Sequence, residues 1–257
     1  AHRALELPEG SEVVLRSHPS TAPPLQKQHS NADESNSAVE VYLQVGVDER
    51  PRTMVLELVA QALTKPAYHQ LRTVEQLGYI VFSGVRHDLG VVGFRVLVQS
   101  SEKDAAELDA RIECFLGTVG ALLDAMGDDE FGNHKKALID LKLEKDKKLR
   151  QESGRYWSEI PLGTYDFERS ELDAEALKAI TKADVRAFWD EHLAPGAPRR
   201  RRLSSQVFAS RHALPPPPAG ARCLETPAAV VAYKRTRPAY PAPGAVEPPE
   251  PPSEYDE

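Results

Sequence analysis

The stretch that decides the fold of this chain reads Leu71-Arg72-Thr73-Val74-Glu75-Gln76-Leu77-Gly78-Tyr79-Ile80-Val81-Phe82-Ser83-Gly84. A charged helical segment passes through Gly78 into a strand with alternating side chains, which predicts a helix-to-strand corner. Arg72 and Tyr79 lie on either side of this corner, seven residues apart. Such a corner can aim a guanidinium and a phenol at one point, where two donors can hold and polarise a carbonyl oxygen. The stretch therefore predicts a mixed fold with a candidate site at the corner.

Hydrophobic residues that alternate with polar ones predict the strands of a sheet. The clearest alternation covers residues 39–48. A hairpin is predicted from residues 79–84 and 91–100, joined through Asp88-Leu89-Gly90. Residues 203–209 would return a strand to the sheet, and residues 12–16 fit a short edge strand.

Apolar residues at helical spacing predict helices between these strands. One such stripe covers residues 55–63, and Pro66 is expected in the first turn of a second, short helix. Two capping boxes predict further helix starts: Ser101 with Asp104, and Thr181 with Asp184. The order of elements predicts an α+β fold, in which a mostly antiparallel sheet is backed by helices on one face.

The composition changes after about residue 212, because 12 of the 21 prolines lie beyond it. We therefore expect residues 1–212 to form one domain and residues 213–257 to form a largely disordered, proline-rich tail. The polyproline runs could dock an aromatic groove of a partner, although a solvated tail is the simpler interpretation.

Charge and cysteine content exclude several classes of function. A net charge of −7 and a pI of about 5.7 argue against nucleic acid or an anionic membrane as partner. No apolar run approaches the roughly 20 residues that span a bilayer. Cys114 and Cys223 are expected to be reduced thiols, as in the cytosol, and Cys114 is expected to be buried on a helical apolar stripe. The chain begins without Met or a signal peptide, which fits a piece of a longer polypeptide.

The histidines give no sign of a metal site. None of the eight lies in His-x-x-Glu-His or His-Glu-x-x-His, the spacings that place two imidazoles on one helical face for zinc. The nearest approach is Phe188-Trp189-Asp190-Glu191-His192, which has Phe at the first ligand position. We expect His192 to be an ordinary residue at a helix end and the chain to bind no metal by itself.

Two interpretations of Arg72 and Tyr79 follow from spacing alone. Tyr68, Arg72 and Glu75 would share one helical face, so Arg72 could pair with Glu75 at the surface while Tyr79 fills the core. Alternatively, Arg72 and Tyr79 form a functional pair. Strand alternation puts Tyr79 on the more polar face, which favours function modestly.

Several segments of the sequence, in order, resemble the insulin-degrading type of zinc peptidase, in the inverzincin or pitrilysin family. They extend from about residue 5 to about residue 210 and include Leu71-Arg72-Thr73, residues 75–84, Tyr156-Trp157 and Ala197-Pro198-Arg199-Arg200. The resemblance is to the last of four homologous domains, and it implies a metallopeptidase-homology (LuxS-like) fold.

The resemblance also implies roles for particular residues. In this family the zinc and the general base lie in the first domain, and two halves close on the peptide. Arg72 and Tyr79 correspond to an Arg and a Tyr that the last domain lends to the active site to bind substrate and stabilise the oxyanion. Tyr68 corresponds to an aromatic that lines a substrate pocket. Lys147 and Lys148 correspond to a lysine pair that binds polyanions such as ATP, although a basic helix end would explain them as well.

We therefore expect the C-terminal domain of a zinc metalloendopeptidase that degrades insulin-like or amyloidogenic peptides, inactive by itself. Its expected partners are the N-terminal zinc domain, the other domains, the substrates and a second copy in a homodimer. A catalytically inactive scaffold of the same fold is the alternative. A polyanion or nucleic-acid binder built on residues 142–150 and 199–202 is disfavoured by the net charge. The family's peroxisome-like C-terminal tripeptide is replaced by Tyr255-Asp256-Glu257, so the expected location is the cytosol.

Overall fold

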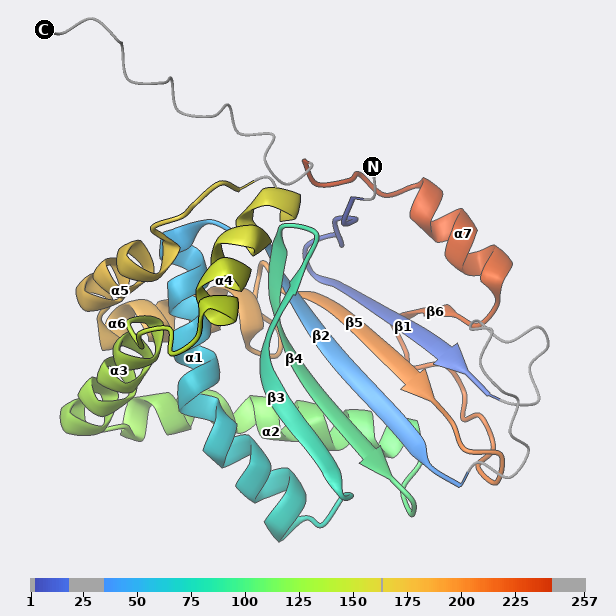
Figure 1. The fold of residues 1–257 in the computed structure, drawn as a ribbon. Coiled ribbons are helices and arrows are strands. Elements are labelled where there is room, and N and C mark those ends of the chain that lie inside the picture. The colour runs from blue at the N-terminus through green and yellow to red at the C-terminus, as the bar shows by residue number, and fades with distance from the viewer. Residues whose placement is uncertain (1–2, 19–34, 163, 242–257) are drawn as a thin grey trace, which may run out of the picture.

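The computed structural model describes residues 3–18, 35–162 and 164–241. Within them a six-stranded sheet has the order β3-β4-β2-β5-β1-β6 (Figure 1). The strands are β1 Ser11–Ser17, β2 Ser37–Val47, β3 Ile80–Asp88, β4 Val91–Ser100, β5 Arg201–Val207 and β6 Arg222–Leu224. The α-helices are α1 Arg50–Tyr68, α2 Ala105–Ala125, α3 Asp128–Lys142, α4 Leu149–Leu162, α5 Arg169–Ala179, α6 Lys182–Phe188 and α7 Pro227–Arg235. Two π-helical segments, η1 His69–Val74 and η2 Trp189–Leu193, continue α1 and α6.

The α+β fold predicted from the sequence is confirmed. Strands β3, β4, β2 and β5 pair antiparallel, whereas β1 pairs parallel with β5 and β6. The predicted hairpin turns through Leu89 and Gly90, both at positive φ, as a two-residue turn requires. The prediction that β1 is an edge strand is wrong. Val13 and Val14 point to opposite faces and both are buried, because β1 lies between β5 and β6 and is covered on both sides.

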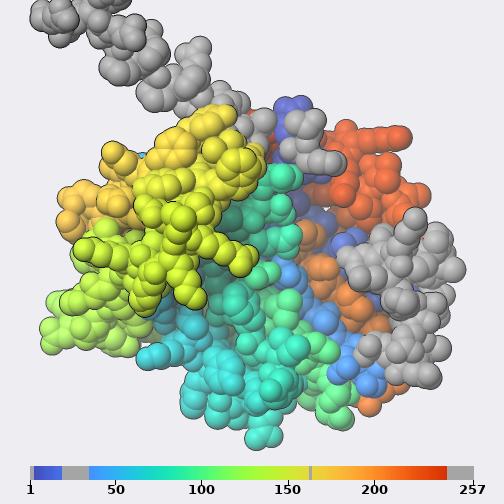
Figure 2. All heavy atoms as spheres, viewed as in Figure 1, coloured from blue at the N-terminus to red at the C-terminus, as the bar shows by residue number. Residues whose placement is uncertain are grey.

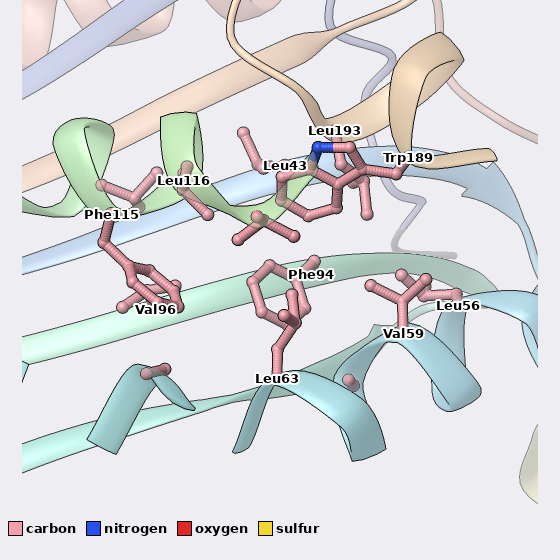
Figure 3. Packing of buried hydrophobic residues seen from close by; sticks show 14 of the residues in the cluster. Leu43, Leu56, Val59, Leu63, Phe94, Val96, Phe115, Leu116, Trp189 and Leu193 are labelled. Carbon is pink, nitrogen blue, oxygen red and sulfur yellow. The ribbon is translucent and has the colours of Figure 1, made fainter. Parts of the chain in front are cut away.

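One face of the sheet carries the main core. The alternating valines and leucine of β2 pack with Phe94 and Val96 of β4 against α1, α2 and η2 (Figure 3). The smaller cluster of Leu7, Val13, Leu224 and Tyr233 lies under α7. Leu203 packs against this second cluster and alternates with residues that contact α2, so α7 covers the opposite face of the sheet, and the prediction of helices on one face only is wrong in this respect. No described helix is long and apolar enough to cross a membrane.

Three local predictions differ from the structure, and a fourth is confirmed. Pro66 lies inside α1 rather than at a new helix start, because buried Ala67 and Leu71 keep this segment against the same core. Asp104 alone caps α2, accepting bonds from two backbone N–H groups, so the box predicted with Ser101 is wrong. The capping box of Thr181 is confirmed. Cys114 is exposed, because it lies beside the buried stripe of α2 and not on it.

The proline-rich segment is partly folded. Within the predicted tail, β6 joins the sheet and α7 starts with Thr226 as N-cap and Pro227 in its first turn. Tyr240 then returns to the N-terminal segment, where its N–H donates to the carbonyl of Ala4. Proline here starts a helix instead of preventing one. The prediction of disorder is therefore wrong for this part of the tail, and residues 242–257 lie outside the described residues.

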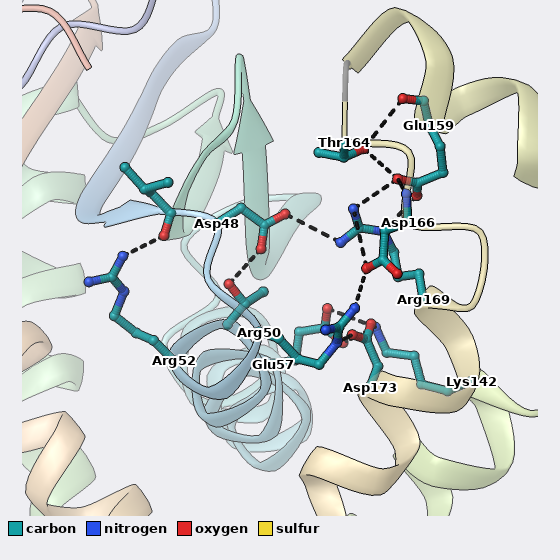
Figure 4. Close-up of polar contacts among 12 residues, drawn as sticks. Asp48, Arg50, Arg52, Glu57, Lys142, Glu159, Thr164, Asp166, Arg169 and Asp173 are labelled. Atoms are coloured by element: carbon teal, nitrogen blue, oxygen red, sulfur yellow. Dashed lines mark hydrogen bonds and ion pairs between the residues drawn. The ribbon is translucent and has the colours of Figure 1, made fainter. Parts of the chain in front are cut away.

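Charged side chains connect the helical layer to the end of β2 (Figure 4). Glu159 of α4 accepts hydrogen bonds from the guanidinium of Arg169, at 2.6 and 3.0 Å, and from Thr164. Arg169 also lies 3.8 Å from Asp48. Burial opposes the ionisation of Glu159, but the bonds from Arg169 and Thr164 outweigh it and lower the pKa of this carboxyl. Glu159 is therefore a carboxylate that holds α4 to the start of α5.

We expect Glu159→Gln to make the stability of the chain less dependent on pH. A lowered folded-state pKa adds stability above the usual glutamate pKa of about 4.3, and that stability is lost as pH falls through the folded-state value. The variant should melt about 3–10 °C lower at pH 7, and the difference should shrink progressively below pH 4. Glu175→Gln, at an exposed surface pair with Lys178, is the matched control and should change little. If Glu159→Gln lowered the melting temperature as much at pH 3 as at pH 7, this role of Glu159 would be contradicted.

Candidate functional site

The predicted corner exists and is held by backbone contacts. The N–H of Leu77 donates to the carbonyl of Leu71 at 3.0 Å, and Gln76 adopts a left-handed φ of 50° to turn the chain. Gly78 then passes against β4, where a Cβ on it would lie 1.8 Å from the carbonyl oxygen of Gln99. Only a residue without a side chain fits this approach. The position of the next residue, Tyr79, is thereby set relative to the sheet.

The π-helical turn η1 decides which side chains meet. Its i to i+5 spacing brings Gln70 to Glu75, with a hydrogen bond of 2.9 Å between their side chains. Glu75 also accepts a bond of 2.6 Å from Arg111 of α2. This bond from Arg111, against partial burial, lowers the pKa of Glu75. Glu75 is thus engaged away from Arg72, and the surface pair of Arg72 with Glu75 does not form.

Arg72 instead lies with two tyrosines. Its Nε donates to the carbonyl of Tyr79 at 3.1 Å, and its guanidinium lies 5.2 Å from the centre of the Tyr79 ring. The Tyr68 ring is 6.0 Å from the same guanidinium. Tyr79 is 85% exposed, so the interpretation that it fills the core is wrong. The structure brings all three predicted residues together at the surface.

Two shallow cavities flank this group at the edge formed by α1, η1 and β3, which lies at the surface in the cyan and teal region of Figure 2. The corner cavity, of about 410 Å³, is lined by Arg72, Thr73, Gln76, Gly78 and Tyr79. The α1–β3 cavity, of about 320 Å³, is lined by Thr64, Lys65, Tyr68, Val81, Phe82 and Ser83. The corner cavity presents cation, phenol and amide groups to solvent, and the α1–β3 cavity is more apolar.

Most residues of the α1–β3 cavity were missed by the sequence analysis, which singled out only Tyr68. The reason is Pro66. With a helix break at this proline, Lys65 would belong to another element, whereas the continuous α1 places it one turn before Tyr68. Alternation predicted the face of Val81 and Ser83 to be the more polar one, and this is wrong: Val81 packs against the core and Ser83 is buried, whereas Phe82 is exposed.

The predicted anion-binding lysines lie between two helices. Helix α3 ends at Lys142, and Lys147 and Lys148 immediately precede α4. Lys147 and Lys148 thus adjoin the N-terminus of α4, and a helix N-terminus carries partial positive charge that disfavours cations. The explanation as a basic helix end therefore fits Lys142, which pairs with buried Asp173, but does not fit Lys147 and Lys148. Lys147 pairs with Glu144 at 2.7 Å.

His192 lies in η2 as predicted, but it is buried beside Phe188 and is not an ordinary surface residue. Burial lowers the pKa of its imidazole. Among the residues that the structure describes, no three or more His, Cys, Asp or Glu side chains gather in an arrangement that could hold a metal ion. The described residues therefore do not fit a zinc site.

Comparison with known proteins gives consistent similarities. Residues 58–157 match the family described as PQQ synthase PqqF-like, C-terminal lobe domain 4. Insulin-degrading enzyme-like 1, peroxisomal, of Arabidopsis thaliana is 40% identical over 71% of this chain and 19% of its own length. Insulin-degrading enzyme of Homo sapiens is 40% identical over 71% of this chain and 18% of its own length. The chain thus spans about a fifth of the length of these curated relatives.

Solved structures share the fold. Pitrilysin aligns with a TM-score of 0.76 and 24% identity, over 94% of this chain and 24% of that protein. An inactive domain of an M16 peptidase from Pseudomonas fluorescens aligns with a TM-score of 0.53 and 16% identity, over 84% of this chain and 48% of that protein.

The corner gives a test in which two glycine substitutions have opposite effects. Gly78→Ala would put its Cβ onto the backbone of Gln99, which no side-chain rotation can relieve, so we expect a loss of about 1–3 kcal/mol in unfolding free energy. Gly117→Ala, inside α2 with nothing within 4 Å, should instead stabilise the chain by up to about 1 kcal/mol through helix propensity. Urea unfolding of both variants measures the difference, and a neutral Gly78→Ala would show that the corner is not held by this contact.

Proposed function

The chain is homologous to the C-terminal part of insulin-degrading enzymes and pitrilysin, and we propose that it forms the non-zinc C-terminal domain of a zinc metalloendopeptidase. The observation that carries this proposal is the exposed pairing of Arg72 with Tyr79 at a rigid corner. A scaffold would need neither group, whereas a peptidase needs donors aimed at the substrate carbonyl.

The geometry suits donation to a developing oxyanion. The carbonyl of Tyr79 holds the Nε of Arg72, and no described carboxylate pairs with this guanidinium, so its outer nitrogens remain available to a ligand. The phenol of Tyr79 is likewise exposed. Two donors from one corner could bind the same carbonyl oxygen, Arg72 in both the ground and transition states, and Tyr79 mainly as negative charge develops.

The zinc of such an enzyme would be held elsewhere, because the described residues of this chain offer no site for it. In this proposal the N-terminal zinc domain faces the corner, and the two halves close around the peptide. Since the donors and the metal belong to different domains, only the closed form would complete the active site. Insulin-like or amyloidogenic peptides are the proposed substrates, and a homodimer in the cytosol is the proposed state and location, although the Arabidopsis relative is named peroxisomal.

Tyr79→Phe in the full-length enzyme tests the catalytic assignment. Loss of one oxyanion donor should reduce the single-turnover rate by roughly 10- to 1000-fold with little change in peptide affinity. The ring remains beside Arg72 and the hydroxyl is exposed, so the melting temperature should stay the same. Tyr165→Phe, at another exposed tyrosine, is the control and should leave the rate unchanged. An unaltered chemical step in Tyr79→Phe would favour the inactive scaffold.

We also propose that Lys147 and Lys148 bind a polyanionic effector such as ATP. Their position before α4 adds lysine charge to the partial positive charge of a helix N-terminus. The double variant Lys147→Ala/Lys148→Ala should lose most of the response of peptide cleavage to triphosphate while keeping basal cleavage. Lys136→Ala/Lys178→Ala, which removes two exposed lysines from helices α3 and α5, is the charge-matched control. An intact triphosphate response in the first double variant would remove this assignment.

A further inference from the structure

The α1–β3 cavity has one charged lining residue, Lys65. Its other lining residues are aromatic, aliphatic or hydroxyl-bearing, and no carboxylate is among them. A cation at the rim of a largely apolar hollow makes the local potential positive, and the low-polarity walls screen this potential less than open water does. The cavity therefore suits a side chain that combines an aliphatic stem with a negative end.

Lys65 is available to a ligand. It forms no ion pair with any residue that the structure describes, unlike Lys142 and Lys147, which both pair with glutamates. The same side chain also borders a third cavity, of about 430 Å³, with Glu130 and His134 among its lining residues. Even there it makes no ion pair with Glu130. Its ammonium group can thus reorient toward an anion that is bound in the α1–β3 cavity.

The cavity adjoins the Arg72–Tyr79 pair through Tyr68. Tyr68 lines the cavity, and the centre of its ring lies 6.0 Å from the Arg72 guanidinium. Lys65 and Arg72 are seven residues apart along α1 and η1, which at helical rise is on the order of 10 Å. An extended peptide covers that distance with about three residues. A ligand held at the corner would therefore place a side chain in the cavity within about three residues of the bound carbonyl.

We propose that the α1–β3 cavity is a subsite for an acidic side chain of the substrate peptide, and that Lys65 determines this preference. The inference rests on the proposed peptidase function and names the substrate feature that this site selects. The apolar stem of a glutamate would contact Tyr68, Val81 and Phe82, while its carboxylate meets the ammonium of Lys65. An arginine or lysine side chain at the same position would be repelled.

A purely apolar role for the cavity is the competing explanation. Lysine stems often cover hydrophobic surface while the charge stays in water, and Lys65 could do the same over Phe82. The two explanations differ in the effect of charge. Methionine keeps most of the stem and removes the charge, so Lys65→Met would preserve an apolar subsite and abolish an acidic one.

The experiment measures kcat/KM of the full-length enzyme for peptides that carry Glu, Gln or Lys at each of three positions on either side of the cleaved bond. At one position we expect the parent enzyme to prefer Glu over Gln by about 2- to 5-fold, the range of a partly exposed ion pair. Lys65→Met should bring this ratio to about 1. Lys65→Glu should make the enzyme prefer Lys over Gln at the same position. Lys136→Glu, which makes the same charge change on an exposed face of α3, should leave the ratio unaltered.

The outcomes separate this subsite from the proposed function. Tyr79→Phe should slow the cleavage of every peptide and keep the Glu-to-Gln ratio, because it acts on chemistry and not on selection. Cleavage with no acidic preference, or with a preference that persists in Lys65→Met, would overturn the subsite alone. An enzyme that cleaves none of the peptides would overturn the proposed function and the subsite together.

Discussion

The close approach of Gly78 to the carbonyl of Gln99 is the constraint on which the candidate site depends. It seats the chain against β4 at the point where η1 ends and β3 begins. On the helical side, Leu71 and Leu77 are both buried, so the turn is anchored by packing as well as by contact with the sheet. Tyr79 follows directly, and its backbone position is set by its neighbours Gly78 and Ile80, which both lie against Gln99 of β4. An exposed phenol is thus attached to a backbone that is constrained by the sheet, as a preorganised donor requires.

Buried charge plays a similar part in joining the helices to the sheet. Arg202 of β5 is almost fully buried, and its guanidinium donates to Asp109 and Glu113 of α2 and to Glu12 of β1. Such a group is costly to desolvate and adds little net stability over an apolar replacement. Its directional bonds nevertheless disfavour other registers of α2 on the sheet. The ion pairs around Glu159 and Arg169 do the same for α4 and α5, whose exposed side chains could otherwise pack in several ways.

The candidate site is open on the side that faces away from the core. Its two cavities are shallow, and the donors of Arg72 and Tyr79 point to solvent rather than to a reacting partner within the described residues. A site of this kind can stabilise charge only after another surface excludes water from it. In the proposed enzyme that surface is the N-terminal zinc domain, and this chain spans about a fifth of the length of its curated relatives.

The existence of strands β1 to β5 and the location of the corner could be predicted from the sequence, whereas β6 lies in a segment that was expected to be disordered. The alternation of apolar and polar residues in β2 and β4 is compatible with only one choice of buried face. The short passage from a charged helix through Gly78 into a strand is compatible with few backbone conformations. The sequence also identified Arg72, Tyr79 and Tyr68, partly through resemblance. It could not decide whether Arg72 meets Glu75 or Tyr79, since that prediction assumed α-helical spacing. Tertiary packing decided it. Burial of Leu71 and Leu77 on either side of Arg72, together with the bond from Arg111, favours a π-helical turn that carries Glu75 away, and no local pattern records that long-range contact.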